Sequence, residues 1–339
     1  MLWKLNLRID GDSMEHIDIK VFFKTLSQME SNHREIRQKI DTVSKAPISL
    51  GLTVERYPYV MVEYHSPEVL DIQSCVGFDV ILPDDYRYND SSLRVVSSNE
   101  TNRDLFFVVA QNLVDTVIDL EYGAIEAFIE KLKVWLKFFR TTRDGILTLK
   151  EQVGLFGELL FIESLLQEGF FNVIDSWKGP LAAAKDFIID DKAVEVKTSV
   201  MSDKNLIHIS DEYQLDASGY DSLYLELFMI YEDRLNGRNI PELAADIEYM
   251  LKDDATRLKL FKDLLFELGY SPKFSHKYQN YFSMSYEYTM KVEGDFPKLT
   301  AGVLPAGISR VSYSVNLENC MPYVIKKDSL VSMFKGENA

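Results

Sequence analysis

The side chains with the clearest capacity for chemistry in this 339-residue sequence lie between residues 185 and 198. Two short apolar runs there flank the polar pair Asp190-Asp191, which is typical of a β-hairpin with a two-residue turn. Side chains alternate between sheet faces, so Glu195 and Lys197 share one face, and the hairpin register sets Asp186 opposite Glu195. Like charges directly opposite each other destabilise a sheet. The pair of carboxylates beside a lysine therefore indicates a divalent cation held between them.

The spacing of these three residues is a weak signal when it is taken alone. The chain has 27% charged residues, and a hairpin with a solvated charged face explains the same letters. The flanking sequence must therefore decide between the two interpretations.

A helix is predicted directly upstream, from residue 149 to about 169. Thr148 and Glu151 have the spacing of a capping box, which marks the start of a helix. Gly154 and Gly157 lie within it, and glycine in a helix costs about 1 kcal/mol relative to alanine. That cost indicates a neighbouring strand that passes close to both glycines.

Glu158 lies in the apolar stripe of this predicted helix. A carboxylate buried there needs a cation, a hydrogen-bond partner or a raised pKa. A glutamate at the edge of the stripe, hydrogen-bonded to a nearby backbone amide, is the open alternative.

The combination of Glu158, Asp186 and the string 195–197 resembles the PD-(D/E)XK nuclease superfamily, which has the restriction-endonuclease-like fold. More narrowly, the chain is similar to a bacterial branch catalogued as a domain of unknown function with a PD-(D/E)XK motif, whose members occur beside phage-defence and restriction genes. Lys185 stands where the motif has proline, a departure that the superfamily tolerates. The narrower resemblance covers most of the chain and is carried by the strings 154–161, 177–180, 186–187, 195–198, 209–215, 296–300 and 304–308.

The resemblance implies Mg²⁺ as cofactor, with Mn²⁺ as a substitute, held by Asp186, Glu195 and the Val196 carbonyl. Hard cations of this kind prefer oxygen ligands. Glu158 would bind a second ion or position a water. Lys197 would orient or deprotonate the attacking water and offset charge that develops on the phosphate.

Gln214 follows the next predicted strand and is a further candidate catalytic residue. It could steady Lys197 or a phosphate oxygen. A surface glutamine without a role is at least as good an interpretation of the sequence.

The expected function is metal-dependent phosphodiester hydrolysis of nucleic acid, with a DNA endonuclease in restriction or phage defence as the favoured form. The alternative is a non-catalytic interaction subunit of a defence complex that keeps the nuclease fold. Retention of all the site residues favours the enzyme. A protein encoded nearby is a candidate partner, and a homo-oligomer remains open.

The formal net charge of −16 argues against nucleic-acid binding, because phosphates favour a basic surface. One basic segment, 131–150, leads into the Glu158 helix and could meet a phosphate backbone. A solvated helix face explains it equally well. Its charged residues are Lys131, Lys133, Lys137, Arg140, Arg143 and Lys150, against Asp144.

The remaining composition indicates an ordinary cytoplasmic globular protein. The only cysteines, Cys75 and Cys320, are expected to be free thiols, and the five histidines lack metal-ligand spacing. No apolar run approaches the ~18–20 residues that span a bilayer. The first residues lack the layout of a signal peptide.

The expected fold is α/β with a mixed sheet: a restriction-endonuclease-like core at 126–339 preceded by a β-rich domain at 1–125. In the first domain, strands are expected at 3–9, 17–23, 57–63 and 105–109, and a helix at 26–40. In the core, helices are expected at 125–139, near Gln214, and at 241–251 and 256–268, the last two forming a helical insertion near 238–270. Core strands are expected at 206–209, 223–231, 281–292 and 308–317, with helices on both faces of the sheet.

Overall fold

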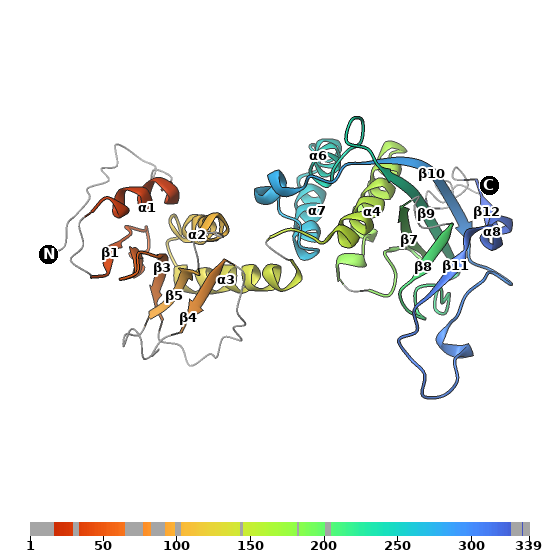
Figure 1. The fold of residues 1–339 in the computed structure, drawn as a ribbon, viewed down its shortest axis with the longest axis horizontal. Coiled ribbons are helices and arrows are strands. Elements are labelled where there is room, and N and C mark those ends of the chain that lie inside the picture. Colours follow the sequence, from red (N-terminus) through yellow and green to blue (C-terminus); the bar gives the residue numbers. More distant parts are fainter. Residues whose placement is uncertain are drawn as a thin grey trace. The chain divides into compact units, whose positions relative to one another are not determined.

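The computed structural model describes residues 17–29, 34–64, 77–82, 92–98, 103–142, 145–181, 183–200, 205–326 and 334. The chain forms two compact units, residues 1–145 and 146–339 (Figure 1). This division lies beyond the expected boundary at 125, because the helix at Ala124–Thr141 packs against the preceding helix of the first unit.

The described residues of unit 1 form an antiparallel five-stranded sheet in the order β1-β2-β3-β5-β4, accompanied by three helices. Strand β3 confirms the strand expected at 57–63, and α3 confirms the helix expected at 125–139. The elements are α1 (Ile19–Ser27), β1 (Ile36–Lys39), β2 (Ile48–Leu52), β3 (Pro58–Glu63), β4 (Phe78–Ile81), β5 (Ser92–Ser97), α2 (Arg103–Val117) and α3 (Ala124–Thr141).

Two short apolar runs that were expected to be strands are helical, so those predictions were wrong. The run at 17–23 belongs to α1, whose buried residues Ile19, Phe23 and Leu26 recur at helical spacing. The run at 105–109 belongs to α2, whose buried face continues to residue 117. An apolar run of about five residues fits either period, and only its longer continuation distinguishes them.

The helix expected at 26–40 was also wrong, because Ile36–Lys39 form β1. Pairing with β2 in the register Ile36↔Leu52 overrides the local helical pattern there. The strand expected at 3–9 lies outside the described residues.

Unit 2 has a mixed five-stranded sheet in the order β12-β10-β9-β7-β6, which confirms the expected fold class. Only β7 and β9 run parallel; the other neighbours are antiparallel. The strands are β6 (Phe187–Ile189), β7 (Lys192–Val200), β9 (Ser222–Glu232), β10 (Phe282–Lys291) and β12 (Val324–Ile325).

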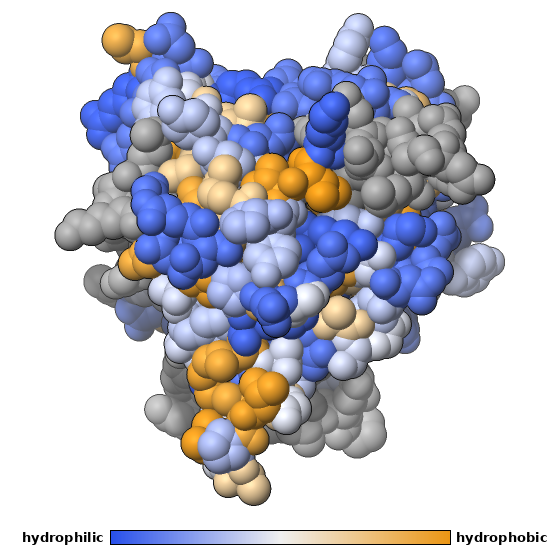
Figure 2. Space-filling model, turned by 90° about the vertical axis from the view of Figure 1, so that its right-hand side faces the viewer, coloured by the Kyte–Doolittle hydropathy of each residue, from blue (hydrophilic) through white to orange (hydrophobic). Residues whose placement is uncertain are grey.

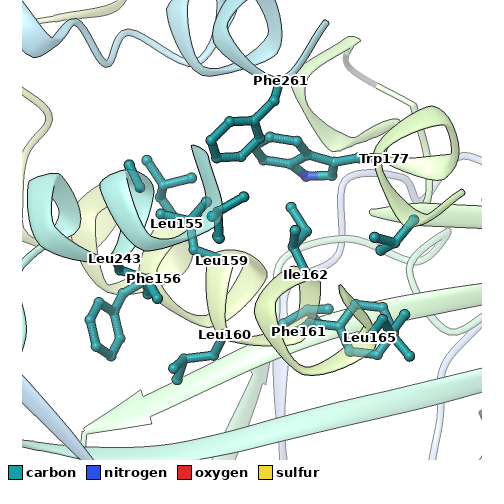
Figure 3. Packing of buried hydrophobic residues seen from close by; sticks show 14 of the residues in the cluster. Leu155, Phe156, Leu159, Leu160, Phe161, Ile162, Leu165, Trp177, Leu243 and Phe261 are labelled. Carbon is teal, nitrogen blue, oxygen red and sulfur yellow. The ribbon is translucent and has the colours of Figure 1, made fainter. Parts of the chain in front are cut away.

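Helices cover one face of this sheet, where α4 packs on β7 and β9, and α6 packs on α4. The capping box is confirmed: Glu151 N donates to Thr148 Oγ1 at 3.4 Å, and Thr148 N donates to Glu151 Oε2 at 2.8 Å. Figure 3 shows the apolar side chains of α4 in contact with Trp177 and Phe261. These helices are α4 (Leu149–Gln167), α5 (Val173–Ser176), α6 (Ile240–Met250) and α7 (Ala255–Glu267).

The opposite face differs from the expectation of helices on both faces. It is covered chiefly by a two-stranded sheet of β8 (Leu206–Ile209) and β11 (Tyr313–Asn316), with the short α8 (Leu317–Cys320) beside it. The strand expected at 308–317 is therefore shorter and pairs with β8 rather than with β10. Short 3-10 helices occupy Gly179–Leu181, Pro272–Lys277, Ala301–Val303 and Met321–Tyr323.

The segment around Gln214 is a turn and not the expected helix. Asp211 Oδ1 accepts hydrogen bonds from the Tyr213 amide at 2.8 Å and the Gln214 amide at 3.1 Å. An aspartate that bonds its own downstream backbone in this way stabilises a turn at the expense of helix.

No helix within the described ranges is long and apolar enough to span a membrane. Cys320 is a buried free thiol, and Cys75 lies outside the described residues.

Candidate active site

The hairpin that carries the candidate carboxylates has the predicted register. Ile189 pairs with Lys192 and Phe187 with Val194 across a turn in which Asp190 adopts a φ of 54°. Aspartate tolerates this left-handed conformation better than most residues. Strand β6 begins at Phe187, so it pairs with β7 only as far as Val194. Beyond Val194, this edge of β7 has no β6 residue to pair with, and side chains can approach it from either face of the sheet.

Asp186 occupies this open edge. Its Oδ2 accepts a hydrogen bond of 2.7 Å from the Val196 amide, which has no β6 residue to pair with. The carboxylate is thus fixed by the backbone of β7 and is half-buried. This contact places Asp186 beside the strand that carries Glu195.

Glu195 and Lys197 lie on one face of β7, as alternation predicts. Lys197 Nζ donates to Glu195 Oε1 at 2.8 Å and to Gln214 Oε1 at 2.8 Å. Glu195 is only 1% exposed. Gln214 Oε1 also accepts from the Ser210 amide at 2.8 Å, so the turn after β8 holds the amide group in place.

Glu158 reaches the same edge from α4. Its Oε2 accepts a hydrogen bond of 2.6 Å from Trp177 Nε1, whose ring is buried. A Cβ atom on Gly179 would lie 3.1 Å from Glu158 Oε2 and 3.2 Å from Asp186 Oδ1. Both carboxylates therefore lie beside the same glycine.

Burial raises the pKa of all three carboxylates, and the charge of Asp186 adds to the shift of the two glutamates. Burial, followed by the charge of Asp186, raises the pKa of Glu195 to about 8, and the same two causes raise the pKa of Glu158. Burial also raises the pKa of Asp186, while Lys197 and the Val196 amide oppose that shift. A lysine and three such acids with raised pKa values, gathered at one strand edge, are typical of a functional site.

Lys185 is a further buried charged residue, and it bonds the turn that carries Gln214. It is 2% exposed, and its Nζ donates to the Tyr213 carbonyl and, at 2.8 Å, to the Gln214 carbonyl. Burial lowers the pKa of Lys185, and nearby carboxylates including Glu195 oppose the shift. The residue that replaces the motif proline thus ties the Asp186 segment to the turn that carries Gln214.

The donor atoms at this edge fit a hard divalent cation. They are carboxylate oxygens of Asp186, Glu195 and Glu158 together with the Val196 carbonyl, all of the type that Mg²⁺ prefers. Gly179 leaves space beside two of the carboxylates that a Cβ would fill. Within the described ranges, however, no three or more His, Cys, Asp or Glu side chains stand together as a preformed metal cage. Glu195 is engaged by Lys197 and Glu158 by Trp177, and a cation would compete with these bonds.

The sequence predicts that a strand passes close to both Gly154 and Gly157 of α4, and the structure confirms this for Gly157 alone. A Cβ on Gly157 would lie 1.9 Å from Thr198 Oγ1, so α4 needs glycine to approach β7 there. Gly154 has open space around it, and the expected strand contact is absent. Gly154 lies about one helical turn before the crossing point, where α4 leaves room for a side chain.

The basic segment at 131–150 is divided between the two units. Lys131, Lys133 and Lys137 belong to α3 of unit 1, whereas Lys150 opens α4 in unit 2. In unit 2, burial and then the charges of Lys150 and Lys197 lower the pKa of His208 on β8.

All five side chains predicted for the site thus meet at one edge of β7: Glu158, Asp186, Glu195, Lys197 and Gln214. Sequence reasoning missed the supporting roles of Trp177 and Lys185. A buried indole needs a hydrogen-bond acceptor and a buried glutamate needs a donor, which is the signal that could have paired Trp177 with Glu158. Nothing in the sequence indicates the partners of Lys185, which are backbone carbonyls of a distant turn.

A family model described as "Putative PD-(D/E)XK family member, (DUF4420)" matches residues 19–318. The chain belongs to this family, and the mixed α/β fold of unit 2 is consistent with the PD-(D/E)XK fold. No curated protein and no solved structure gave a significant match.

Proposed function

We propose that this protein is a metal-dependent nuclease that hydrolyses phosphodiester bonds, with DNA as the favoured substrate. The observation that carries the proposal is the Lys197 ammonium, bonded to Glu195 and Gln214 within a group of carboxylates from three segments. A structural ion pair needs one acid, whereas this edge gathers three. Such an excess of buried negative charge is destabilising unless a cation offsets it.

Asp186 and Glu195, with the Val196 carbonyl, would hold Mg²⁺ or Mn²⁺, and Glu158 would extend the site on the α4 side. When bound, the ion supplies a Lewis acid that polarises the phosphate and offsets its charge. The Asp186 carboxylate is oriented for this role by the Val196 amide, and Glu158 by Trp177.

Lys197 would act on the water and the phosphate. An ammonium has three donors. Two are used on Glu195 and Gln214, so the third is directed by these bonds and can meet a phosphate oxygen or the attacking water. This arrangement favours positioning and charge stabilisation over proton abstraction by Lys197.

Cleavage of supercoiled plasmid DNA tests the proposal. Wild type is expected to nick or linearise the plasmid in Mg²⁺ and not in EDTA. Glu195→Gln should reduce the rate at least ~100-fold, because loss of one preorganised charged group typically costs that much. Asp191→Asn, which changes an exposed turn carboxylate, is the matched control and should behave as wild type.

The rival function is an interaction subunit of a defence complex that retains the fold without catalysis. The net charge of −16 supports it, since an acidic surface suits a protein partner better than a polyanion. Equal plasmid cleavage by wild type and Glu195→Gln, or metal-dependent cleavage by neither, would favour this rival.

A further inference from the structure

An exposed apolar loop extends from unit 2 between β10 and β11. Residues 297–312, here called the arm, include Leu299, Val303 and Ile308, which are 39%, 65% and 53% exposed. Figure 1 shows the arm as the blue loop below β11, and Figure 2 shows an apolar protrusion at the same lower end of the molecule. Large apolar side chains gathered on a projecting loop normally mark an interaction site.

The arm is fixed at its base. Phe296 packs against Tyr323, with ring centroids 5.1 Å apart, and the Leu299 amide donates to Tyr313 Oη at 2.9 Å. Near the other end, the amides of Arg310 and Val311 donate to the carboxylate of Glu212 at 3.0 and 2.9 Å. The projecting shape is therefore held by bonds at both ends.

These anchors connect the arm to the candidate active site. Glu212 is 2% exposed and lies in the same turn as Gln214, the hydrogen-bond partner of Lys197. The arm then continues into β11, which pairs with β8, the strand that leads to this turn. A polymer bound at Lys197 would accordingly pass close to the arm.

The charge of the arm differs from that of the chain as a whole. Residues 296–317 contain Lys298 and Arg310 and no aspartate or glutamate, whereas the chain has a net charge of −16. This acid-free segment should repel a polyanion less than the acidic remainder of the chain does. Apolar side chains that wedge between base steps, flanked by cations that contact phosphates, are a known way to grip a duplex through its minor groove.

We propose that the arm inserts into the groove of a nucleic-acid duplex beside the candidate active site, with Val303 and Ile308 as the apolar wedge and Lys298 and Arg310 on the phosphates. The substrate of the proposed nuclease would then be double-stranded. This inference rests on the proposed function for its site, but duplex binding can be measured without hydrolysis.

The test compares full-length wild type with the double variant Val303→Ser/Ile308→Ser in metal-free buffer. The probe is a short DNA duplex carrying a fluorophore for anisotropy and 2-aminopurine as a reporter of base unstacking. The double variant should bind the duplex about tenfold or more weakly, and the 2-aminopurine signal that wild type induces should disappear. Leu235→Ser is the matched control, because Leu235 is 92% exposed in a turn of the same unit and should bind as wild type.

Absence of duplex binding by wild type, or equal binding and unstacking by the double variant, would overturn the proposal. Gel filtration tests whether the arm instead joins two copies of the chain. If the double variant lost self-association but kept duplex binding, the arm would be assigned to contacts between copies, and the duplex proposal would be overturned. Plasmid cleavage in Mg²⁺ is measured separately, so a protein that binds duplex through the arm without cleaving it would support the arm and contradict the nuclease.

Discussion

Asp186, Glu195 and Glu158 meet at a strand edge where their negative charges repel one another. Lys197 forms an ion pair with Glu195, and the uncharged indole of Trp177 donates to Glu158. The raised pKa values mean that folding disfavours the ionised forms, chiefly through burial. At neutral pH the site therefore destabilises the fold, and a bound cation would remove that penalty.

Asp186→Asn should raise the melting temperature in EDTA at neutral pH. The pKa of Asp186 is raised on folding, so its ionisation destabilises the native state once the pH exceeds the unfolded value, and the asparagine carbonyl can still accept from the Val196 amide. The advantage should shrink as the pH falls toward about 4, near the ordinary pKa of an aspartate.

Mg²⁺ should reverse the order of the two melting temperatures, so that wild type melts above Asp186→Asn. Wild type should gain several degrees in saturating Mg²⁺ and the variant little, because ligand binding to the native state stabilises it. Differential scanning fluorimetry with and without Mg²⁺ checks both parts, with Asp191→Asn as control. A variant that responds to Mg²⁺ as strongly as wild type would remove Asp186 from the metal site.

Lys185→Met should lower the free energy of unfolding by about 1–3 kcal/mol, since two backbone carbonyls lose their buried donor. Urea denaturation measures this. Lys192→Met, at the partly exposed hairpin turn, should stay within about 0.5 kcal/mol of wild type. If the two variants were equally stable, the bonds of Lys185 to the Gln214 turn would make no contribution to the free energy of unfolding.

At the scale of elements, the approach of α4 to β7 depends on one glycine. Gly157→Ala would drive a methyl group into Thr198, and overpacking of this kind typically costs 1–3 kcal/mol. Gly154→Ala meets open space and should instead stabilise the helix by about 1 kcal/mol. Thermal or urea unfolding of the two variants compares them directly, and a stabilising Gly157→Ala would contradict the close contact.

The hairpin and the start of α4 could be predicted because their signals are local. A two-residue polar turn sets the register of its strands, and a capping box lies within four residues of sequence. The register and the alternation of side chains in turn predicted that Asp186, Glu195 and Lys197 lie together, and the motif resemblance joined Glu158 to them. Those inferences needed no knowledge of tertiary packing.

Other features depend on contacts between distant segments and could not be predicted. Residues 36–39 became a strand because β2 pairs with them, and the apolar runs of α1 and α2 were too short to show their period. Gly154 and Gly157 look alike in sequence, and only the crossing point on β7 separates them. Likewise, the partner of β11 is β8, which lies about a hundred residues earlier and has no matching pattern.

At the scale of the whole molecule, unit 2 contains the full candidate site and its own two apolar clusters. Residues 146–339 expressed alone should therefore fold cooperatively and keep the Mg²⁺-dependent rise in melting temperature. Circular dichroism and scanning fluorimetry of this fragment check the prediction. A fragment that does not fold would show that unit 1 is required for the stability of the site.

The net charge of −16 affects how the molecule meets nucleic acid. Repulsion between acidic surfaces and phosphates should keep nonspecific binding weak, so productive contact would depend on the cations near the site and on the arm. The acidic remainder of the surface would then be available to a protein partner without loss of the proposed nuclease chemistry.

The most direct test of the central claim is the rate of phosphodiester cleavage in saturating Mg²⁺ by wild type, Lys197→Ala and Lys192→Ala. Lys197 bonds both Glu195 and Gln214, whereas Lys192 lies on the same strand at the hairpin turn. We predict wild-type rates for Lys192→Ala and a loss of at least ~100-fold for Lys197→Ala, with its Mg²⁺-induced rise in melting temperature retained. Equal rates for all three proteins, or no Mg²⁺-dependent cleavage by any of them, would contradict the assignment of this strand edge as a nuclease active site.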